Sequence, residues 1–211
     1  MQEYNKIDTV FERDVNGTKK LIRGQFRSKA VEYLANNQWM FTEKIDGTNI
    51  RVHWDGNRVE FGGRTERAQI PATLVTYLND TFGGDANEEL FEQKFGENEV
   101  ILFGEGYGSG IQKGGLYRSD VSFILFDVMV GSTYLERENI ENIAKTFNID
   151  VVPIIGTGTI QEAVNIVVTN PMSTIGKAPM EGIVARPIVE MKDRMGHRII
   201  TKIKACDFEC A

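Results

Sequence analysis

Glu43-Lys44-Ile45-Asp46-Gly47-Thr48-Asn49 is the stretch of this sequence that decides the fold. Bulky, strand-prone residues precede it at Trp39–Thr42, and apolar and polar residues alternate after it at Ile50–Trp54. Asp46-Gly47 is a turn signal, so we expect a hairpin in which Lys44 ends the first strand. A lysine at the end of a strand has its backbone fixed on both sides, so its ammonium group points in one direction. A fixed direction suits a nucleophile.

A lysine is cationic at neutral pH and becomes nucleophilic only if desolvation or neighbouring cations lower its pKa. Two such cations occur near the end of the chain, where Ile200–Lys204 alternates so that Lys202 and Lys204 share one face of a strand. Paired ammonium groups on one face repel each other unless they face an anion. The alternative interpretation of Lys44 is a lysine beside an ordinary hairpin turn.

Composition places the chain among globular proteins. It has 211 residues, a formal net charge of -6 and a pI near 5.1, which argues against a broad basic surface that grips nucleic acid non-specifically. No apolar run is long enough for a signal peptide or a membrane span, so we expect a soluble, cytoplasmic protein with no membrane partner. Cys206 and Cys210 are expected to be free thiols.

The chain shows no internal repeat and no Pro/Gly/Ser-rich linker, so we expect one domain over residues 1–211 and no separate C-terminal domain. Apolar residues at helical intervals predict helices at 71–78, 88–95, 136–147 and 159–168. A strand is expected at 151–155 between the last two of these helices.

Two charged residues follow glycine-containing strand ends. Arg64 comes just after Gly62-Gly63, where its guanidinium could make two hydrogen bonds to phosphate or ribose oxygens. The alternative interpretation, equally good, is a solvent-exposed arginine in a hairpin. Glu105 follows the apolar run Val100–Phe103 and lies among glycines. Its carboxylate could accept a ribose hydroxyl hydrogen bond or hold a metal ion, and the alternative is a plain glycine-rich loop.

Two further candidates lie on strands. Phe126 belongs to the strongly strand-like run Val121–Val130 and could form a stacking wall beside Asp127; the alternative is a core phenylalanine. Glu181 heads the strand-like run Pro179–Pro187 and is a metal-ligand candidate, with a simple strand-end glutamate as the alternative.

These separated signals occur in the order found in the covalent nucleotidyltransferases, the superfamily of polynucleotide ligases and mRNA capping enzymes. The sequence most closely resembles the phage RNA ligase 2 family, from about Trp39 to Lys204. The motifs that carry the resemblance are Glu43-Lys44-x-x-Gly47-Thr48-Asn49, Arg64, Phe103-Gly104-Glu105, Gly108-x-Gly110-Ile111-Gln112-Lys113, Phe126-Asp127, Glu181-Gly182 and Lys202-x-Lys204.

The resemblance implies an α+β nucleotidyltransferase fold, in which antiparallel sheets flanked by helices surround an ATP cleft. It implies that Lys44 takes AMP covalently and that Lys202 and Lys204 contact the α-phosphate, where they would also lower the pKa of Lys44. Roles near the nucleotide follow for the remaining motif residues: Glu43 and Asn49 near the adenylate and the polynucleotide phosphate, Arg64 at the nucleotide or acceptor, Glu105 at the ribose, Phe126 on the adenine, and Glu181 at Mg²⁺ or Mn²⁺, with Glu105 as a second metal-ligand candidate.

The same resemblance implies an ATP-dependent polynucleotide ligase that acts in nucleic acid repair. Lys44 would displace pyrophosphate from ATP, AMP would move to a 5′-phosphate end, and a 3′-hydroxyl would then expel AMP and seal the strand. The expected partner is nucleic acid with a nick or adjacent ends, bound by a monomer. RNA, DNA and hybrid substrates stay open, as do two alternative functions: a GTP-using capping-type guanylyltransferase and a non-catalytic nucleotide or nucleic-acid binding module.

Overall fold

The computed structural model describes residues 1–208, so Cys210 lies outside the described residues. The chain forms two compact units. Unit 1 comprises Met1–Asn5 and Asp46–Val152, and unit 2 comprises Lys6–Ile45 and the chain from Pro153 onward. The expectation of one domain over residues 1–211 stays a prediction. The boundary after Ile45 falls inside the stretch 43–49, so Lys44 belongs to unit 2 and Asn49 to unit 1.

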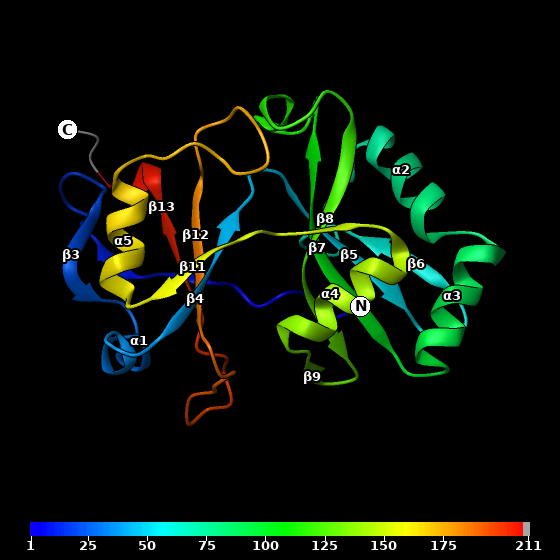
Figure 1. The fold of residues 1–211 in the computed structure, drawn as a ribbon, viewed down its shortest axis with the longest axis horizontal. Helices are drawn as coiled ribbons and strands as arrows, with labels where there is room; N and C mark the ends of the chain where they lie inside the picture. The colour runs from blue at the N-terminus through cyan, green and yellow to red at the C-terminus, as the bar shows by residue number, and fades with distance from the viewer. Residues whose placement is uncertain (209–211) are drawn as a thin grey trace. The chain divides into compact units, whose positions relative to one another are not determined.

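Unit 1 is built on a six-stranded sheet of order β10-β8-β7-β5-β6, with β9 paired to β8 (Figure 1). Its neighbours are antiparallel except that β10 runs parallel to β8. The strands are β5 (Thr48–Trp54), β6 (Val59–Gly62), β7 (Val100–Gly108), β8 (Val121–Val130), β9 (Thr133–Tyr134) and β10 (Asp150–Val151). The helices are α2 (Ala72–Phe82), α3 (Asp85–Phe95), α4 (Arg137–Phe147) and the short 3-10 helix η1 (Gly114–Leu116).

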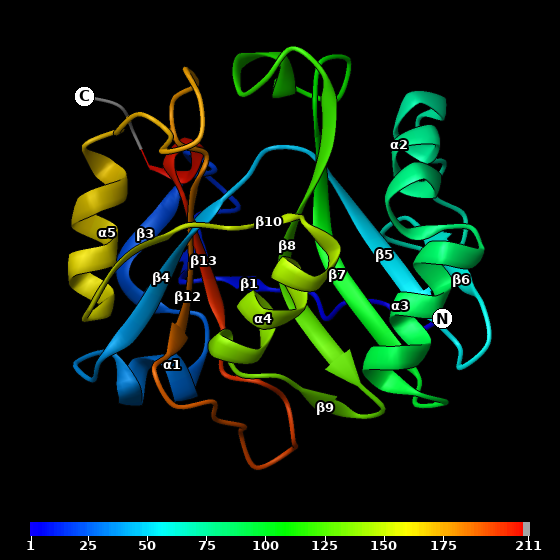
Figure 2. The same ribbon diagram turned by 45° about the vertical axis from the view of Figure 1, so that its right-hand side comes forward.

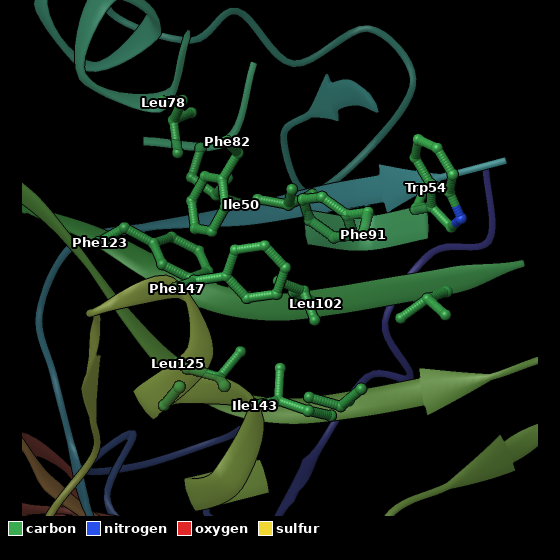
Figure 3. Packing of buried hydrophobic residues seen from close by; sticks show 14 of the residues in the cluster. Ile50, Trp54, Leu78, Phe82, Phe91, Leu102, Phe123, Leu125, Ile143 and Phe147 are labelled. Carbon is green, nitrogen blue, oxygen red and sulfur yellow. The ribbon is translucent and has the colours of Figure 1, made fainter. Parts of the chain in front are cut away.

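The main core of unit 1 lies between one face of this sheet and its three α-helices, as the packed side chains in Figure 3 show. Helix α4 supplies Ile140, Ile143, Ala144 and Phe147, whose i, i+3, i+4, i+7 spacing places them on one side of the helix. The opposite face of the sheet carries a smaller cluster around Ile101, Phe103 and Met129. Because β7 is covered on both faces, its start reads as an unbroken apolar run.

Unit 2 is built on a five-stranded sheet of order β1-β13-β12-β4-β11. Only β1 pairs in parallel, with β13. The strands are β1 (Asp8–Thr9), β4 (Trp39–Lys44), β11 (Ile154–Gly158), β12 (Gly182–Pro187) and β13 (Thr201–Lys204), and β2 (Phe11–Arg13) pairs separately with β3 (Leu21–Phe26). The helices are α1 (Lys29–Leu34), α5 (Ile160–Val168) and the 3-10 helix η2 (Ala205–Asp207).

Helix α5 shows how the sequence shapes unit 2 (Figure 2). Thr159 and Glu162 form a capping box at its start, which satisfies two otherwise unpaired backbone N–H groups. Ile160, Val164 and Val167 are buried at helical spacing and pack in the core of this unit. The predicted helix at 159–168 is therefore confirmed, as are those at 71–78, 88–95 and 136–147.

Two details differ from the sequence-based expectations. The predicted hairpin around Asp46-Gly47 is wrong, because β4 pairs with β12 and β11 whereas β5 pairs with β6 and β7. The strand expected at 151–155 is instead two strands, β10 and β11, which belong to different sheets. In both cases the local pattern was strand-like, but strand pairing is decided by distant segments. None of the helices within residues 1–208 has the length and apolar character to cross a membrane.

Phe91 tests the core of unit 1. Its ring is fully buried, lies 4.3 Å from the Phe147 ring centroid and stacks 5.7 Å from that of Trp54. Phe91→Ala should lower the free energy of unfolding by about 3–5 kcal/mol, because it removes a large buried ring and leaves a cavity. Urea unfolding followed by tryptophan fluorescence measures this loss.

Phe95→Ala is the matched control, since Phe95 is only partly buried against the same core. A loss at Phe95 as large as that at Phe91 would contradict this assignment of the core.

Candidate active site

Three strands of unit 2 bring the predicted catalytic residues together. In the pairing of β4, β12 and β13, Gly182 lies opposite Lys44 on one side and opposite Lys204 on the other. Residues paired across neighbouring strands point to the same face of a sheet, so both lysines project from one face. Gly182 carries no side chain between them, and an added Cβ there would lie 2.1 Å from the carbonyl oxygen of Ile203.

The Glu181 carboxylate bridges the two lysines. Lys44 Nζ donates to Glu181 Oε2 at 2.7 Å, and Lys204 Nζ lies 3.0 Å from Glu181 Oε1. The side chain of Lys44 is 26% exposed, that of Glu181 16% and that of Lys204 29%. The cluster is therefore largely shielded but still reachable from solvent. Two lysines on one face of a sheet repel each other unless an anion lies between them. Here that anion is Glu181, the residue just before β12.

This carboxylate also affects the charge of Lys204. Burial alone lowers the pKa of Lys204, but the hydrogen bond to Glu181 and the Coulomb attraction of Glu181, together with that of nearby groups such as Asp207, raise that pKa above its ordinary value. Lys204 is therefore cationic at neutral pH, as its predicted contact with an α-phosphate would require.

Lys202 lies on the same face as Lys204, two residues back along β13, which corresponds to about 7 Å. It pairs with Val184 of β12, which in turn pairs with Thr42 of β4. The alternation at Thr201–Lys204 agrees with this placement, since Thr201 and Ile203 are buried while both lysines are partly exposed. The structure therefore groups Lys44, Glu181, Lys202 and Lys204 on one face.

Glu43 points the other way. Its side chain is buried, its Oε1 accepts from Ser173 Oγ at 2.5 Å, and its Oε2 accepts from the backbone N and the hydroxyl of Thr174. The carboxylate thereby anchors residues 171–180, the segment that leads directly to Glu181. The predicted contact of Glu43 with adenylate stays a prediction, and the contacts observed here are structural.

The second half of the stretch 43–49 lies in unit 1 against the glycine-rich end of β7. A Cβ on Gly47 would lie 2.3 Å from the carbonyl oxygen of Gly106, so only glycine fits this close approach. Asn49 pairs with Glu105 across β5 and β7. The Oδ1 atom of Asn49 is buried and has no hydrogen-bond partner among residues 1–208, which leaves an acceptor for a ligand donor.

Glu105 lies within a strand. The apolar run at 100–103 was expected to end in a glycine-rich segment, but β7 continues through Gly108 and pairs with both β5 and β8. The glycines are needed for packing: a Cβ on Gly104 would lie 2.2 Å from the Phe123 ring. Glu105 is therefore held by backbone on both sides.

Phe126 and Arg64 complete the predicted set. Phe126 is partly exposed on β8 and packs against the cluster around Phe103. Arg64 is exposed just after Gly63, whose carbonyl oxygen accepts from Arg51 Nε at 2.8 Å.

Arg51 is only 1% exposed, and the sequence does not indicate this burial, because nothing local marks a polar residue of an alternating strand as buried. The predicted residues thus fall into two sets, with Lys44, Glu43, Glu181, Lys202 and Lys204 in unit 2 and Asn49, Arg64, Glu105 and Phe126 in unit 1.

The two predicted metal ligands, Glu181 and Glu105, belong to different sets. Within residues 1–208, no group of three His, Cys, Asp or Glu side chains could hold a metal ion. Mg²⁺ commonly binds through one or two carboxylates, several waters and substrate phosphates, so a lone carboxylate such as Glu181 fits an ion that arrives with a nucleotide.

Solved structures share this fold. An apo variant of Naegleria gruberi RNA ligase has 18% sequence identity and a TM-score of 0.63, covering 83% of this chain and 51% of that chain. A variant with ATP and Mn has 18% identity and a TM-score of 0.64, covering 96% and 59%. A variant with AMP and Mn has 16% identity and a TM-score of 0.64, covering 94% and 60%.

At such identities the likeness shows the fold, which confirms the predicted α+β class of antiparallel sheets and helices and agrees with a nucleotidyltransferase type. The family model of RNA ligases matches residues 37–204, most of the chain. The chain therefore belongs to the RNA ligase family, as its motifs predict. It spans about half the length of the solved RNA ligases it resembles.

The anchoring role of Glu43 is testable by proteolysis. Glu43→Ala would leave the donors of Ser173 and Thr174 without their buried acceptor, at a cost of about 1–3 kcal/mol. Residues 171–180 should then open more often, so trypsin should cleave after the exposed Lys177 several-fold faster. Mass spectrometry of the fragments measures the rate.

Glu92→Ala removes an exposed carboxylate from α3 and is the control. If cleavage after Lys177 is as slow in Glu43→Ala as in Glu92→Ala, the anchoring role is wrong.

Proposed function

We propose that this chain acts as an ATP-dependent RNA ligase, with Lys44 as the nucleophile that takes AMP. The observation that carries the proposal is the single carboxylate of Glu181 shared by Lys44 and Lys204, with Lys202 on the same face. A reactive amine beside fixed cations and one acidic group is what transfer of a nucleotidyl group to lysine requires. Membership of the RNA ligase family supports the same reaction.

The reaction runs in three steps. The neutral amine of Lys44 attacks the α-phosphorus of ATP: the N–P phosphoramidate bond forms as the P–O bond to pyrophosphate breaks, and the nitrogen releases a proton to solvent. AMP then passes from Lys44 to a 5′-phosphate end, which frees the lysine. Finally a 3′-hydroxyl attacks that activated phosphate, the strand is sealed and AMP leaves.

The surrounding residues have distinct tasks in the first step. The Lys44 ammonium that donates to Glu181 must lose a proton before attack. Lys202 and Lys204 would stabilise the charge that grows on the α-phosphate oxygens. Glu181 would hold Mg²⁺ or Mn²⁺, and such an ion would neutralise further phosphate charge when bound. The related Naegleria gruberi enzyme, solved with ATP and Mn, supports this choice of nucleotide and metal.

The nucleophile assignment predicts the outcome of covalent labelling. With ATP labelled at the α-phosphate and Mg²⁺ or Mn²⁺, the wild-type chain should acquire an acid-labile, gel-stable AMP label, and Lys44→Ala should lose at least about 10³-fold of it, since no other group replaces a missing nucleophile. Lys192→Ala, at an exposed lysine of the same unit, should label normally.

Labelling with GTP and not ATP would identify a guanylyltransferase. Absence of any label would favour a binding module, and unchanged labelling of Lys44→Ala would place the nucleophile elsewhere.

The bridging role of Glu181 predicts a second loss. Glu181→Gln keeps the size of the side chain but removes the negative charge that balances the two lysines and the carboxylate that would hold the metal. Self-adenylylation should fall about 10²-fold while the fold persists by circular dichroism. The control is Glu190→Gln, which removes a carboxylate paired with Arg198 in the same unit. Equal rates in Glu181→Gln and wild type would refute the bridging role.

The nucleic acid that is sealed requires its own experiment. A panel of nicked duplexes with RNA or DNA on the 3′-hydroxyl side and on the 5′-phosphate side should show sealing of nicks that contain RNA. Efficient sealing of all-DNA nicks alone would contradict an RNA ligase. Action as a monomer inside the cell is part of the same proposal.

A further inference from the structure

The first residues of the chain form an arm that is packed into unit 1. Met1–Asn5 belongs to this unit, although the residues that follow belong to the other. Arg51, buried on β5, donates from Nη1 to the carbonyl oxygen of Met1 at 2.9 Å. Tyr4 packs on the sheet face opposite the main core, in the cluster around Ile101, Phe103 and Met129.

Tyr4 is fixed both at its ring and at its hydroxyl. The ring centroid lies 4.9 Å from that of Phe103 and 5.1 Å from that of Phe126. The hydroxyl donates to Asp127 Oδ2 at 2.8 Å, and Asp127 is fully buried. A partly buried hydrogen bond at one end and aromatic contacts around the ring leave Tyr4 little rotational freedom.

Phe126 lies at an irregularity of β8. Phe103 pairs with Asp127, but the next residue of β7, Gly104, pairs with Leu125, so the register between β7 and β8 shifts by one residue at Phe126. An extra residue of this kind is a β-bulge, which turns its side chain away from regular alternation. The strand alone therefore does not set the direction of the Phe126 ring. Tyr4 meets the Phe126 ring edge-on, with an interplanar angle of 69°.

We propose that Tyr4 is a positioning residue that orients Phe126 for stacking on the nucleotide base, so that the N-terminal arm sets the affinity for ATP. This rests on the proposed function, in which Phe126 stacks on adenine. Tyr4 touches no reacting atom. Its loss should weaken the contribution of the base to binding and leave the phosphate chemistry unchanged.

The test is the ATP dependence of the self-adenylylation rate in Tyr4→Leu, Phe126→Leu and the double variant. Tyr4→Leu should raise the half-saturating ATP concentration roughly 3- to 10-fold, the range expected for losing one aromatic pair, with the maximal rate unchanged. In the Phe126→Leu background the same substitution should have almost no further effect. Tyr33→Leu, at a tyrosine 86% exposed on α1, should behave as wild type.

A substrate without the base distinguishes the proposed role of Tyr4 from a purely structural one. If Tyr4 acts through the base, ribose 5′-triphosphate, which lacks the base, should be used equally by wild type and Tyr4→Leu. Two results would overturn the proposal. One is a fall in the maximal rate of Tyr4→Leu with both substrates. The other is a half-saturating ATP concentration in the double variant that is raised by the product of the two single-variant factors, as for independent residues.

If Tyr4→Leu does not fold, Tyr4→Phe replaces it, because it keeps the ring and loses only the hydrogen bond to Asp127. Tyr4→Phe should raise the half-saturating ATP concentration roughly 2- to 3-fold, again only when Phe126 is present. No change in Tyr4→Phe would then overturn the proposal. A wild-type chain that does not label with ATP would refute the proposed function itself, whereas normal labelling with no effect of Tyr4 would refute this inference alone.

Discussion

The carboxylate of Glu181 is the interaction on which the rest of the site depends. Two ammonium groups that project from one sheet face repel each other, and partial burial strengthens that repulsion because less water screens it. Glu181 offsets it by giving one oxygen to Lys44 and the other to Lys204. Both lysines are thereby held in place by one carboxylate, which would reduce the reorganisation that the proposed nucleotidyl transfer requires.

This arrangement also constrains the backbone. Lys44 and Lys204 end their strands in register with the same residue, Gly182, and the close approach of the Ile203 carbonyl leaves no room for a side chain at that position. A side chain there would also stand between the two ammonium groups. The Glu181-Gly182 pair therefore combines two requirements, an anion at the head of the strand and an open position directly after it.

Local pattern predicted the elements well and their pairing poorly. Period-two alternation placed Lys202 and Lys204 on one face, and helical spacing located α2 through α5, because both signals are contained within a few residues. The predicted hairpin at Asp46-Gly47 is wrong because β4 pairs with the distant strand β12, where Gly182 lies opposite Lys44, and no local signal encodes that choice. The roles of Arg51 and Tyr4 were equally hidden, since each depends on a segment distant in sequence.

Alternation in β4 explains why the adjacent residues Glu43 and Lys44 make different contacts. Neighbouring side chains on a strand point to opposite faces. Lys44 faces the cation-bearing surface, so Glu43 must enter the interior, where a carboxylate is tolerated only with hydrogen-bond donors. Ser173 and Thr174 supply those donors, and they belong to the segment that delivers Glu181. The backbone of Glu43-Lys44 thus connects to Glu181 by two routes, through the lysine on one face and through the anchored segment on the other. A change at either face therefore reaches the same carboxylate.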